Sequence, residues 1–331
     1  MGISHASMRN NTKSLFYFKK SHEIAPYQDN FINLNLHRQQ LSQKSFSEKK
    51  EFFLEYSKKS PSPDVFLQLS HFYLIEKKFK TFFKYQEKSF EISQKTSENK
   101  LQFSNVCLAF EKFEKAWKLY NSRIDLEDIK RNFSKNITSF PKQGKKILFR
   151  REQGLGDFIL FGFFLRALNK YSNNEISIEI DNRLKTTFER SFPSFNFILQ
   201  QPPIVKGYDY IFPIGHLGFY FGKDTNCFAK NFPYLFPNFK KLRYFKKKYQ
   251  KLFPNKRLVG FSWKTTSSQT KELRSIPLKE FLQITTDSQI QWINLQYKMT
   301  EEEKQTLSLK KNIYTDPELD VFEDIDSLCA L

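Results

Sequence analysis

The stretch REQGLGDFILFG, at residues 151–162, carries the residues best suited to chemistry. Gly154 and Gly156 lie two residues apart, with Glu152 before them and Asp157 after them. Glycines give a tight turn its backbone freedom, and an acid such as Asp157 favours the positive end of a helix. A carboxylate at such a turn can also orient and deprotonate a hydroxyl nucleophile. Glu152 is expected to accept hydrogen bonds from backbone N–H groups and so hold the turn.

Two other interpretations of this stretch stay open. A dinucleotide-binding loop, GxGxxG, would use Gly154 and Gly156, and Asp181 follows the next predicted strand, where a ribose-binding acid would lie. The third glycine position holds Ile159, which counts against this interpretation. A purely structural corner between a strand and a helix needs only the glycines and the capping acid, and it is compatible with a function.

Alternating strands and helices are predicted around the turn. Short apolar or alternating segments predict strands at 145–151, 175–180, 195–200 and 208–215, and helical segments follow the first two. This order indicates a parallel sheet with helices on both faces. Ligands bind at the carboxyl ends of the strands in such sheets, which is where the glycine turn lies.

A second α/β region is predicted after a connection at 218–256 that is rich in Phe, Asn, Pro and Lys. Strands are expected at 256–263 and 291–297, with a short strand and the beginning of a helix near the end of the sequence. About 75 residues are few for an α/β unit, which needs more strands to bury its helices. We therefore expect the second lobe to be incomplete.

The region before residue 140 is predicted to be helical and repetitive. Apolar residues recur three and four apart, and the pattern returns after 34 residues, the period of the tetratricopeptide repeat. The first copy contains Phe66, Leu69, Ser70, Tyr73 and Phe79, and the second contains Lys100, Phe103, Ser104, Cys107 and Phe113. The two small serines should let paired helices approach closely. An earlier copy between Phe31 and Tyr56 is weaker, and an unrelated helical bundle is the alternative.

The bulk composition indicates a globular protein with a strong positive charge. A chain of 331 residues suggests two domains, and its 39% apolar content is enough for real cores. A net charge of +19 attracts phosphate-bearing partners, although abundant Lys, Asn, Ile and Phe also indicate A/T-rich codons. The densest basic run, at 240–251, is expected to be a solvated helix face or linker rather than a nucleic-acid patch, because no recognition module accompanies it.

The remaining signals favour a cytoplasmic protein. Cys107, Cys227 and Cys329 are far apart, which argues against disulfides and a zinc cluster. The longest apolar run, at 158–165, is far too short to span a membrane, so at most the protein is peripheral at the inner membrane face. The five histidines show no metal-ligand spacing. His216 follows the fourth predicted strand, where it is either a polar loop residue or a functional contact.

Several motifs, in order over roughly residues 105–331, carry a family resemblance. EQGLGDFILFGFFLRAL, preceded by FEKFEKAWKLYNSR, resembles bacterial tetratricopeptide proteins with a fused glycosyltransferase-like domain. These are similar to glycosyltransferase family 9, the ADP-heptose:lipopolysaccharide heptosyltransferase group. The further matches are DNRLKTTFERSFPSF, YDYIFPIGHLG, VGFSWKTTSSQTKELRSIPL, NLQY and FEDIDSLCAL.

The resemblance implies a GT-B architecture, in which two Rossmann-like lobes face each other across a cleft. Tetratricopeptide-like helices would occupy 1–140, an acceptor-side lobe 145–250, and a partial nucleotide-sugar donor lobe 256–331. The implied reaction transfers a sugar from a nucleotide sugar to a hydroxyl of a glycan, a lipid-linked sugar or a protein. The nucleotide sugar is a substrate, and neither a cofactor nor a metal is implied.

The resemblance also implies roles for individual residues. Asp157 falls on the carboxylate proposed as the general base, within the turn formed by Gly154 and Gly156. Lys264 and Thr265 lie just after the first donor-lobe strand, and a cation at Arg274 would bind the donor diphosphate, which suits the negative charge of the leaving group. Gln296 and Tyr297, at a strand end, would line the nucleotide site.

One departure from the family concerns the end of the sequence. The family continues into a strand and an Asp-x-x-x-x-His segment at the donor phosphates, whereas this sequence ends at Leu331. We therefore expect either a fragment truncated at the C-terminus or a protein that has lost its donor site and its activity. The alternative functions are a tetratricopeptide-type protein-interaction scaffold without catalysis and nucleic-acid binding driven by charge.

Overall fold

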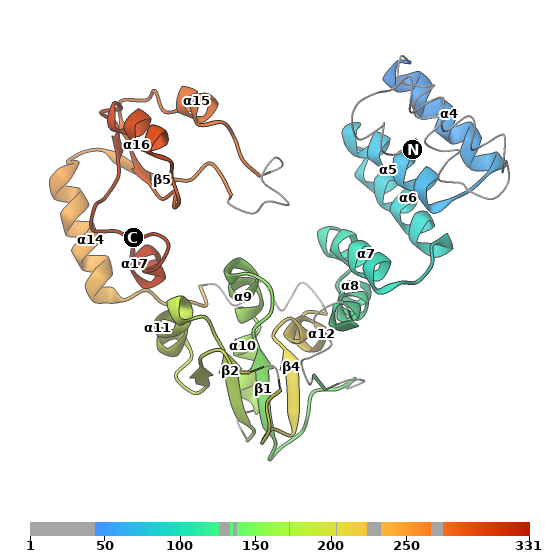
Figure 1. Cartoon of the computed structure of the whole chain (residues 1–331), viewed down its shortest axis with the longest axis horizontal. Helices are drawn as coiled ribbons and strands as arrows, with labels where there is room; N and C mark the ends of the chain where they lie inside the picture. Colours follow the sequence, from blue (N-terminus) through green and yellow to red (C-terminus); the bar gives the residue numbers. More distant parts are fainter. Residues whose placement is uncertain are drawn as a thin grey trace. The chain divides into compact units, whose positions relative to one another are not determined.

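The computed structural model describes residues 44–125, 133–134, 138–171, 173–202, 204–223, 233–265 and 274–331 (Figure 1). The chain divides into two compact units. One takes in Met1–Arg131 and Gly218–Ala229, and the other takes in Asn132–Leu217 and Lys230–Leu331. Cys227 and the first part of the weak early repeat lie outside the described residues.

The first unit is built from consecutive helices that repeat. They are α4 (Phe46–Lys59), α5 (Pro63–Ile75), α6 (Phe79–Ile92), α7 (Ser97–Ala109) and α8 (Phe113–Tyr120), followed by the 3₁₀ helix η1 (Asn121–Asp125). Both ends of α5 recur 34 residues later in α7, and the first residue of α6 recurs as the first residue of α8. The predicted helix-turn-helix repeat is confirmed.

The ends of the helices repeat with the same period. Ser62 and Thr96 cap α5 and α7, and each side chain accepts a hydrogen bond from the N–H three residues further on. Lys77 and Glu111, in the turns between paired helices, both take the left-handed conformation, with φ of 58° and 56°. Turn geometry is therefore part of the repeated unit.

Small buried residues allow the paired helices to approach, as predicted. Ser70 and Ser104 are fully buried, and each hydroxyl donates to the carbonyl three residues earlier at 2.6 Å. Phe82 is buried at the position that Ala116 occupies in the second copy, which makes the first copy the bulkier one. Phe79 begins α6 as expected, but about half of its side chain is exposed.

The second unit begins with a four-stranded parallel sheet. Its strands are β1 (Lys146–Arg150), β2 (Glu175–Glu179), β3 (Asn196–Ile198) and β4 (Tyr210–Pro213), in the order β3-β2-β1-β4. Figure 1 shows β2, β1 and β4 side by side. Helix α9 (Leu155–Gly162) follows β1, α10 (Leu165–Leu168) comes next, α11 (Asn182–Ser191) follows β2, and α12 (His216–Phe221) follows β4. β1 and β2 are buried beyond their first residues, as expected for strands covered on both faces.

A second parallel sheet lies in the same unit. Its strands are β5 (Arg257–Phe261), β6 (Ile290–Asn294) and β7 (Ile313–Tyr314), in sequence order. Short helices α15 (Leu278–Phe281) and α16 (Glu301–Ser308) connect them, and α17 (Ile325–Ala330) follows β7. The predicted fold class, repeated helices followed by an α/β region with parallel sheets, is confirmed.

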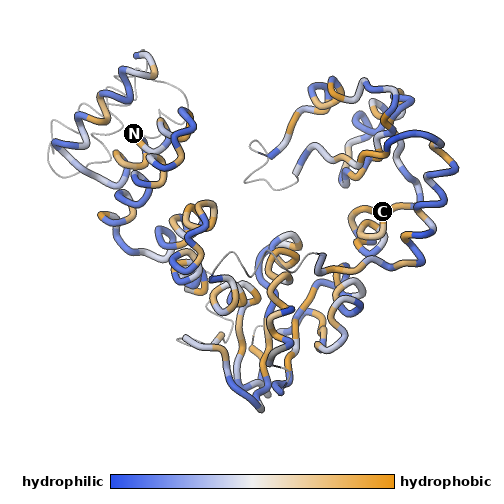
Figure 2. The backbone as a smooth tube through the Cα atoms, turned by 180° about the vertical axis from the view of Figure 1, so that it is seen from behind, coloured by the Kyte–Doolittle hydropathy of each residue, from blue (hydrophilic) through white to orange (hydrophobic). Residues whose placement is uncertain are grey.

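The basic run at 240–251 forms a helix, α14 (Phe239–Leu252), that leads into β5. Its Phe245 and Tyr249 are buried against Ile293 and Ala330. Its tube is mostly hydrophilic in Figure 2. The expectation of a solvated helix face is therefore correct for the outer side of α14, while its inner side belongs to the core.

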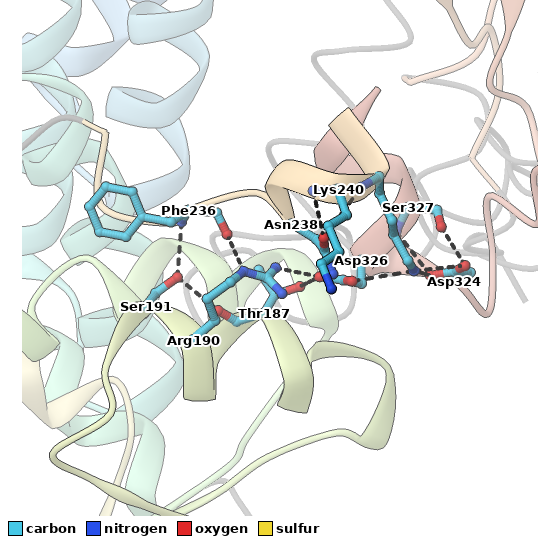
Figure 3. A network of polar contacts seen from close by, with 10 residues as sticks. Thr187, Arg190, Ser191, Phe236, Asn238, Lys240, Asp324, Asp326 and Ser327 are labelled. Carbon is cyan, nitrogen blue, oxygen red and sulfur yellow. Dashed lines mark hydrogen bonds and ion pairs between the residues drawn. The ribbon is translucent and has the colours of Figure 1, made fainter. Parts of the chain in front are cut away.

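Polar contacts join α17 to α11 and α14 (Figure 3). Asp326 accepts hydrogen bonds from Thr187 at 3.1 Å and from Arg190, both on α11. Lys241 of α14 pairs with Asp324 at 3.1 Å and with Asp326 at 3.3 Å. The acidic C-terminal segment therefore binds the helix that follows β2 to the helix that precedes β5.

Candidate functional site

The glycine turn lies at the topological switch point of the first sheet. In the order β3-β2-β1-β4, the chain runs outward from β1 through β2 and β3 and then crosses to β4 on the other side. Ligands of open parallel sheets bind outside the carboxyl ends of the two strands where this reversal occurs. The turn follows β1, and residues 214–216 follow β4, so both loops lie at this switch point.

Glu152 joins the two loops across the switch point. Its side chain is buried, and Oε1 accepts a hydrogen bond from Gly215 N at 2.6 Å. The predicted role of Glu152, to hold the turn through a backbone N–H, is confirmed. The partner N–H follows β4 rather than belonging to the turn itself, so Glu152 fixes the spacing of both loops.

The glycines act differently from the prediction. Neither Gly154, at φ −88°, nor Gly156 takes the left-handed conformation, and the left-handed residue of the turn is Gln153, at φ 57°. Backbone freedom is therefore not why these glycines suit the turn. A Cβ on Gly156 would meet no atom within 4 Å, so this residue leaves open space beside the helix start.

Asp157 has one oxygen in the turn and one outside it. Oδ2 accepts a hydrogen bond from Gly154 N at 3.1 Å, which confirms the predicted capping role. The side chain is half-buried, and Oδ1 takes no hydrogen bond within the part of the chain that the structure describes. The geometry therefore provides a fixed carboxylate with one oxygen able to accept a proton.

At the carboxyl end of the second sheet, a buried side chain again joins two strand ends, as Glu152 does at the first sheet. Gln296, buried just beyond β6, accepts hydrogen bonds at 3.0 Å from the backbone N–H groups of Trp263 and Lys264, just beyond β5. Its Nε2 donates to Tyr297 O at 2.9 Å. Gln296 thus holds two strand ends together, and its amide is engaged by backbone groups rather than turned to a ligand.

The residues predicted to bind the donor, Lys264, Thr265 and Arg274, lie just beyond the carboxyl end of β5. Thr265 N donates to Ser275 Oγ at 3.2 Å, and Ile276 N donates to Trp263 O at 2.9 Å. These bonds hold the segment that begins at Arg274 against the end of β5. Arg274 itself is exposed.

Lys264 is already paired in this arrangement. Its Nζ lies 2.7 and 2.5 Å from the two carboxylate oxygens of Glu303, in the first turn of α16. Burial favours the neutral acid, but the hydrogen bonds from Lys264 and Thr300 outweigh it and lower the pKa of Glu303. An anionic ligand at Lys264 would therefore compete with a carboxylate that stays ionised.

Phe322 connects the carboxyl ends of the two sheets. The Arg183 guanidinium, just beyond β2, lies 4.8 Å from the Phe322 ring centroid. Just beyond β6, the Tyr297 ring lies 5.2 Å and the Lys298 ammonium 4.8 Å from the same ring. The ends of β2 and β6 therefore meet at one aromatic side chain, a contact that no local sequence pattern predicts.

Asp181 does not offer a ready ribose site. Its Oδ2 pairs with Arg151 at 2.8 Å, and its Oδ1 pairs with Arg183 at 2.9 Å. The hydrogen bond from Arg183 lowers the pKa of Asp181 to about 2, against the opposing effect of burial. A nucleoside ribose would have to displace these guanidinium groups, which weakens the dinucleotide interpretation further.

Other candidate groups take structural positions. His216 is buried at the start of α12, and its ring stacks on Phe212 at 5.7 Å. Among the described residues, no three His, Cys, Asp or Glu side chains are grouped to hold a metal ion. Within the same residues, no helix combines the length and the apolar character needed to cross a membrane.

Comparisons with known proteins give remote similarities. No protein-family model matches the chain. Protein FlbA of Caulobacter vibrioides is 24% identical over 258 residues, which covers 70% of this chain and 43% of FlbA. The chain thus spans less than half the length of that relative.

Two solved structures are similar at low scores. MamA covers 38% of this chain and 74% of its own, at a TM-score of 0.27 and 11% identity. A mutant of the Thermobaculum terrenum O-GlcNAc transferase covers 61% of this chain and 40% of its own, at a TM-score of 0.29 and 9% identity. At these scores the similarities carry no argument about function.

Proposed function

We propose that the α/β unit is glycosyltransferase-like and transfers a sugar from a nucleotide sugar to a hydroxyl acceptor on a glycan, a lipid-linked sugar or a protein. The observation that carries the proposal is the meeting of two parallel-sheet ends at Phe322, with Asp157 beyond one sheet and Lys264 and Arg274 beyond the other. This arrangement supports a GT-B-like pair of lobes with the acceptor side at the first sheet.

Asp157 would act as the general base. Its Oδ2 keeps the turn fixed, while Oδ1 takes the proton of the acceptor hydroxyl as the oxygen bonds to the sugar carbon. The bond from that carbon to the diphosphate breaks in the same reaction. The open space at Gly156 gives the acceptor room to approach.

The leaving nucleoside diphosphate would be stabilised at the second sheet. Its negative charge grows as the bond breaks, so cations placed there stabilise the transition state. The exposed Arg274 guanidinium suits two phosphate oxygens at once. Lys264 would contribute after exchanging Glu303 for a phosphate oxygen.

The Asp157→Asn variant tests the base. Asparagine can still accept the hydrogen bond from Gly154 N, so the turn and the fold should survive while the base is lost. We expect transfer to fall by about 10²-fold or more, measured as nucleoside diphosphate released in the presence of acceptor. Asp64→Asn, which alters another first-turn acid in α5, is the matched control and should leave transfer unchanged. Unchanged transfer by Asp157→Asn would remove Asp157 from the mechanism.

A protein-interaction scaffold is the second candidate, and a groove in the first unit favours it. A cavity of about 270 Å³ lies among α5, α6 and α7 and is lined by carboxamides and aromatic rings, including Gln86, Asn99, Gln102, Phe90 and Phe103. Side chains of this kind suit the backbone and side chains of an extended peptide. The Asn99→Ala/Gln102→Ala variant should weaken the binding of an extended peptide partner. It should not change glycosyl transfer to a small acceptor. If both activities fall together, the groove is not a separate binding site.

A further inference from the structure

Helix α14 separates its positive charges into two sets. It carries seven basic residues and no acidic one. Lys241 and Lys248 are half-buried and paired, Lys241 with Asp324 and Lys248 with Asp316 at 2.8 Å. The other five, which we term the cationic stripe, are exposed and have no ion pair among the described residues: Lys240, Arg243, Lys246, Lys247 and Lys251.

The stripe is held facing solvent by the packing of the opposite side. Phe245 and Tyr249 lie on the other side of α14, where they are 5% and 3% exposed and pack in the core. Asn238 caps the helix start through the N–H groups of Lys240 and Lys241. A/T-rich codons explain many lysines, but they do not explain why the inner lysines pair with carboxylates while the outer ones pair with none that the structure describes.

An exposed aromatic residue accompanies the stripe. Phe239 is 61% exposed and lies one turn before Arg243, on the same side of the helix. Lysines beside an exposed apolar ring are typical of surfaces that bind anionic lipid, where the cations meet head groups and the ring enters the interface. A second exposed ring, Tyr244, is tied down by its hydroxyl, which donates to Glu318. Nucleic-acid sites favour arginine, whereas four of the five stripe residues are lysine.

We propose that the cationic stripe and Phe239 dock the second unit on a membrane surface of anionic phospholipid. The cysteine pattern predicts a cytoplasmic protein, so the surface would be the cytoplasmic face. The binding is peripheral and electrostatic, since the apolar side of α14 is already used in the core. This inference does not depend on glycosyl transfer.

Two lysine variants of the full chain with equal charge change test the proposal. The stripe variant carries Lys240→Gln, Lys246→Gln, Lys247→Gln and Lys251→Gln. The control carries Lys206→Gln, Lys279→Gln, Lys310→Gln and Lys311→Gln, all exposed and outside the stripe. Cosedimentation is measured with phosphatidylcholine vesicles and with vesicles that contain about one third phosphatidylglycerol. Thermal melting checks that both variants fold.

Comparing the two variants separates the effect of where the lysines lie from the effect of the net charge on vesicle binding. The unmodified chain should bind the anionic vesicles only, and the stripe variant should lose about 10-fold or more in partition while the control loses less than about 2-fold. Equal losses in both variants, or no binding by the unmodified chain, would overturn the proposal. A duplex DNA titration at the same salt completes the test: a stripe-specific loss for DNA without one for vesicles would assign the surface to nucleic acid instead.

Discussion

At the scale of residues, both sheets use the same device to shape their carboxyl ends. A buried acceptor side chain follows one strand, Glu152 after β1 and Gln296 after β6, and binds backbone N–H groups just beyond the neighbouring strand. These hydrogen bonds hold the ends of two neighbouring strands together. The groups left at the surface, Asp157 Oδ1 and Arg274, are the ones we assign to chemistry.

Two glycines in α9 give a matched residue-scale prediction. A Cβ at Gly162 would lie 2.6 Å from the buried Phe188 ring, whereas one at Gly156 would meet nothing within 4 Å. Gly162→Ala should therefore lower the free energy of unfolding by about 1–3 kcal/mol through overpacking. Gly156→Ala should change it by less than about 1 kcal/mol, in the stabilising direction.

The Gly156→Ala variant also tests the proposed approach of the acceptor. If Gly156 leaves room for the acceptor, Gly156→Ala should raise the KM for acceptor while the protein melts no earlier than the unmodified chain. Chemical denaturation and transfer kinetics measure both properties. A destabilised Gly156→Ala would contradict the open space at this position.

How far the sequence predicted these residues depends on how local their contacts are. The cap by Asp157 was predictable, because its partner Gly154 lies in the same turn. The sequence also predicted that Glu152 would accept from a backbone N–H, but it did not predict the partner Gly215, which lies 63 residues further along the chain. The left-handed Gln153 was not, since the turn had two glycines that could have taken that conformation. Phe322 was missed as well, because its partners Arg183 and Tyr297 are distant in sequence.

At the scale of elements, ion pairs from the acidic segment that contains α17 hold α11 and α14 together. Burial favours the neutral form of Asp326, but its bonds with Arg190 and Lys241 prevail and lower its pKa. The pKa values of Asp316 and Asp324 are also lowered, because their hydrogen bonds outweigh the effect of burial. The contact is therefore strongest when these carboxylates are ionised.

Acid should loosen this segment. The pKa of Asp326 is lower in the folded state than in the unfolded state. Its contribution to the free energy of unfolding is therefore complete above the unfolded pKa, about 4, and is lost as the pH falls through the folded pKa. Asp326→Asn should cost about 1–3 kcal/mol at neutral pH and flatten the decline in stability below about pH 4. Glu323→Gln, an exposed neighbour, is the control.

Urea unfolding followed from pH 7 to about pH 2 measures this effect. A pH profile for Asp326→Asn that runs parallel to that of the unmodified chain would contradict the account, because it would mean that Asp326 titrates alike in the folded and unfolded states.

Elements differed in how well the sequence predicted them. The 34-residue repeat could be located because apolar residues and a small serine recur with one spacing; the recurring caps and left-handed turns were found only in the structure. All four strands of the first sheet were expected, but their order was not, since it depends on crossovers rather than on local pattern. The basic run could be assigned to a solvated helix, but not its pairing with residues 316–326.

At the scale of the whole molecule, a repeat unit and an α/β unit with two parallel sheets share one chain. Under the proposed function, Asp157 beyond one sheet would be the base and the cations beyond the other would bind the donor, with Phe322 in contact with the ends of both sheets. The proposed function requires that the end of the second sheet binds a nucleoside diphosphate.

Calorimetric titration of the full chain with ADP, UDP and GDP tests that claim most directly. We predict binding of at least one of them, weakened about 10-fold by Arg274→Gln, unchanged by Lys279→Gln and unchanged by Asp157→Asn, which acts on the acceptor side. Absence of binding by all three nucleotides, or binding that Arg274→Gln leaves intact, would contradict the account.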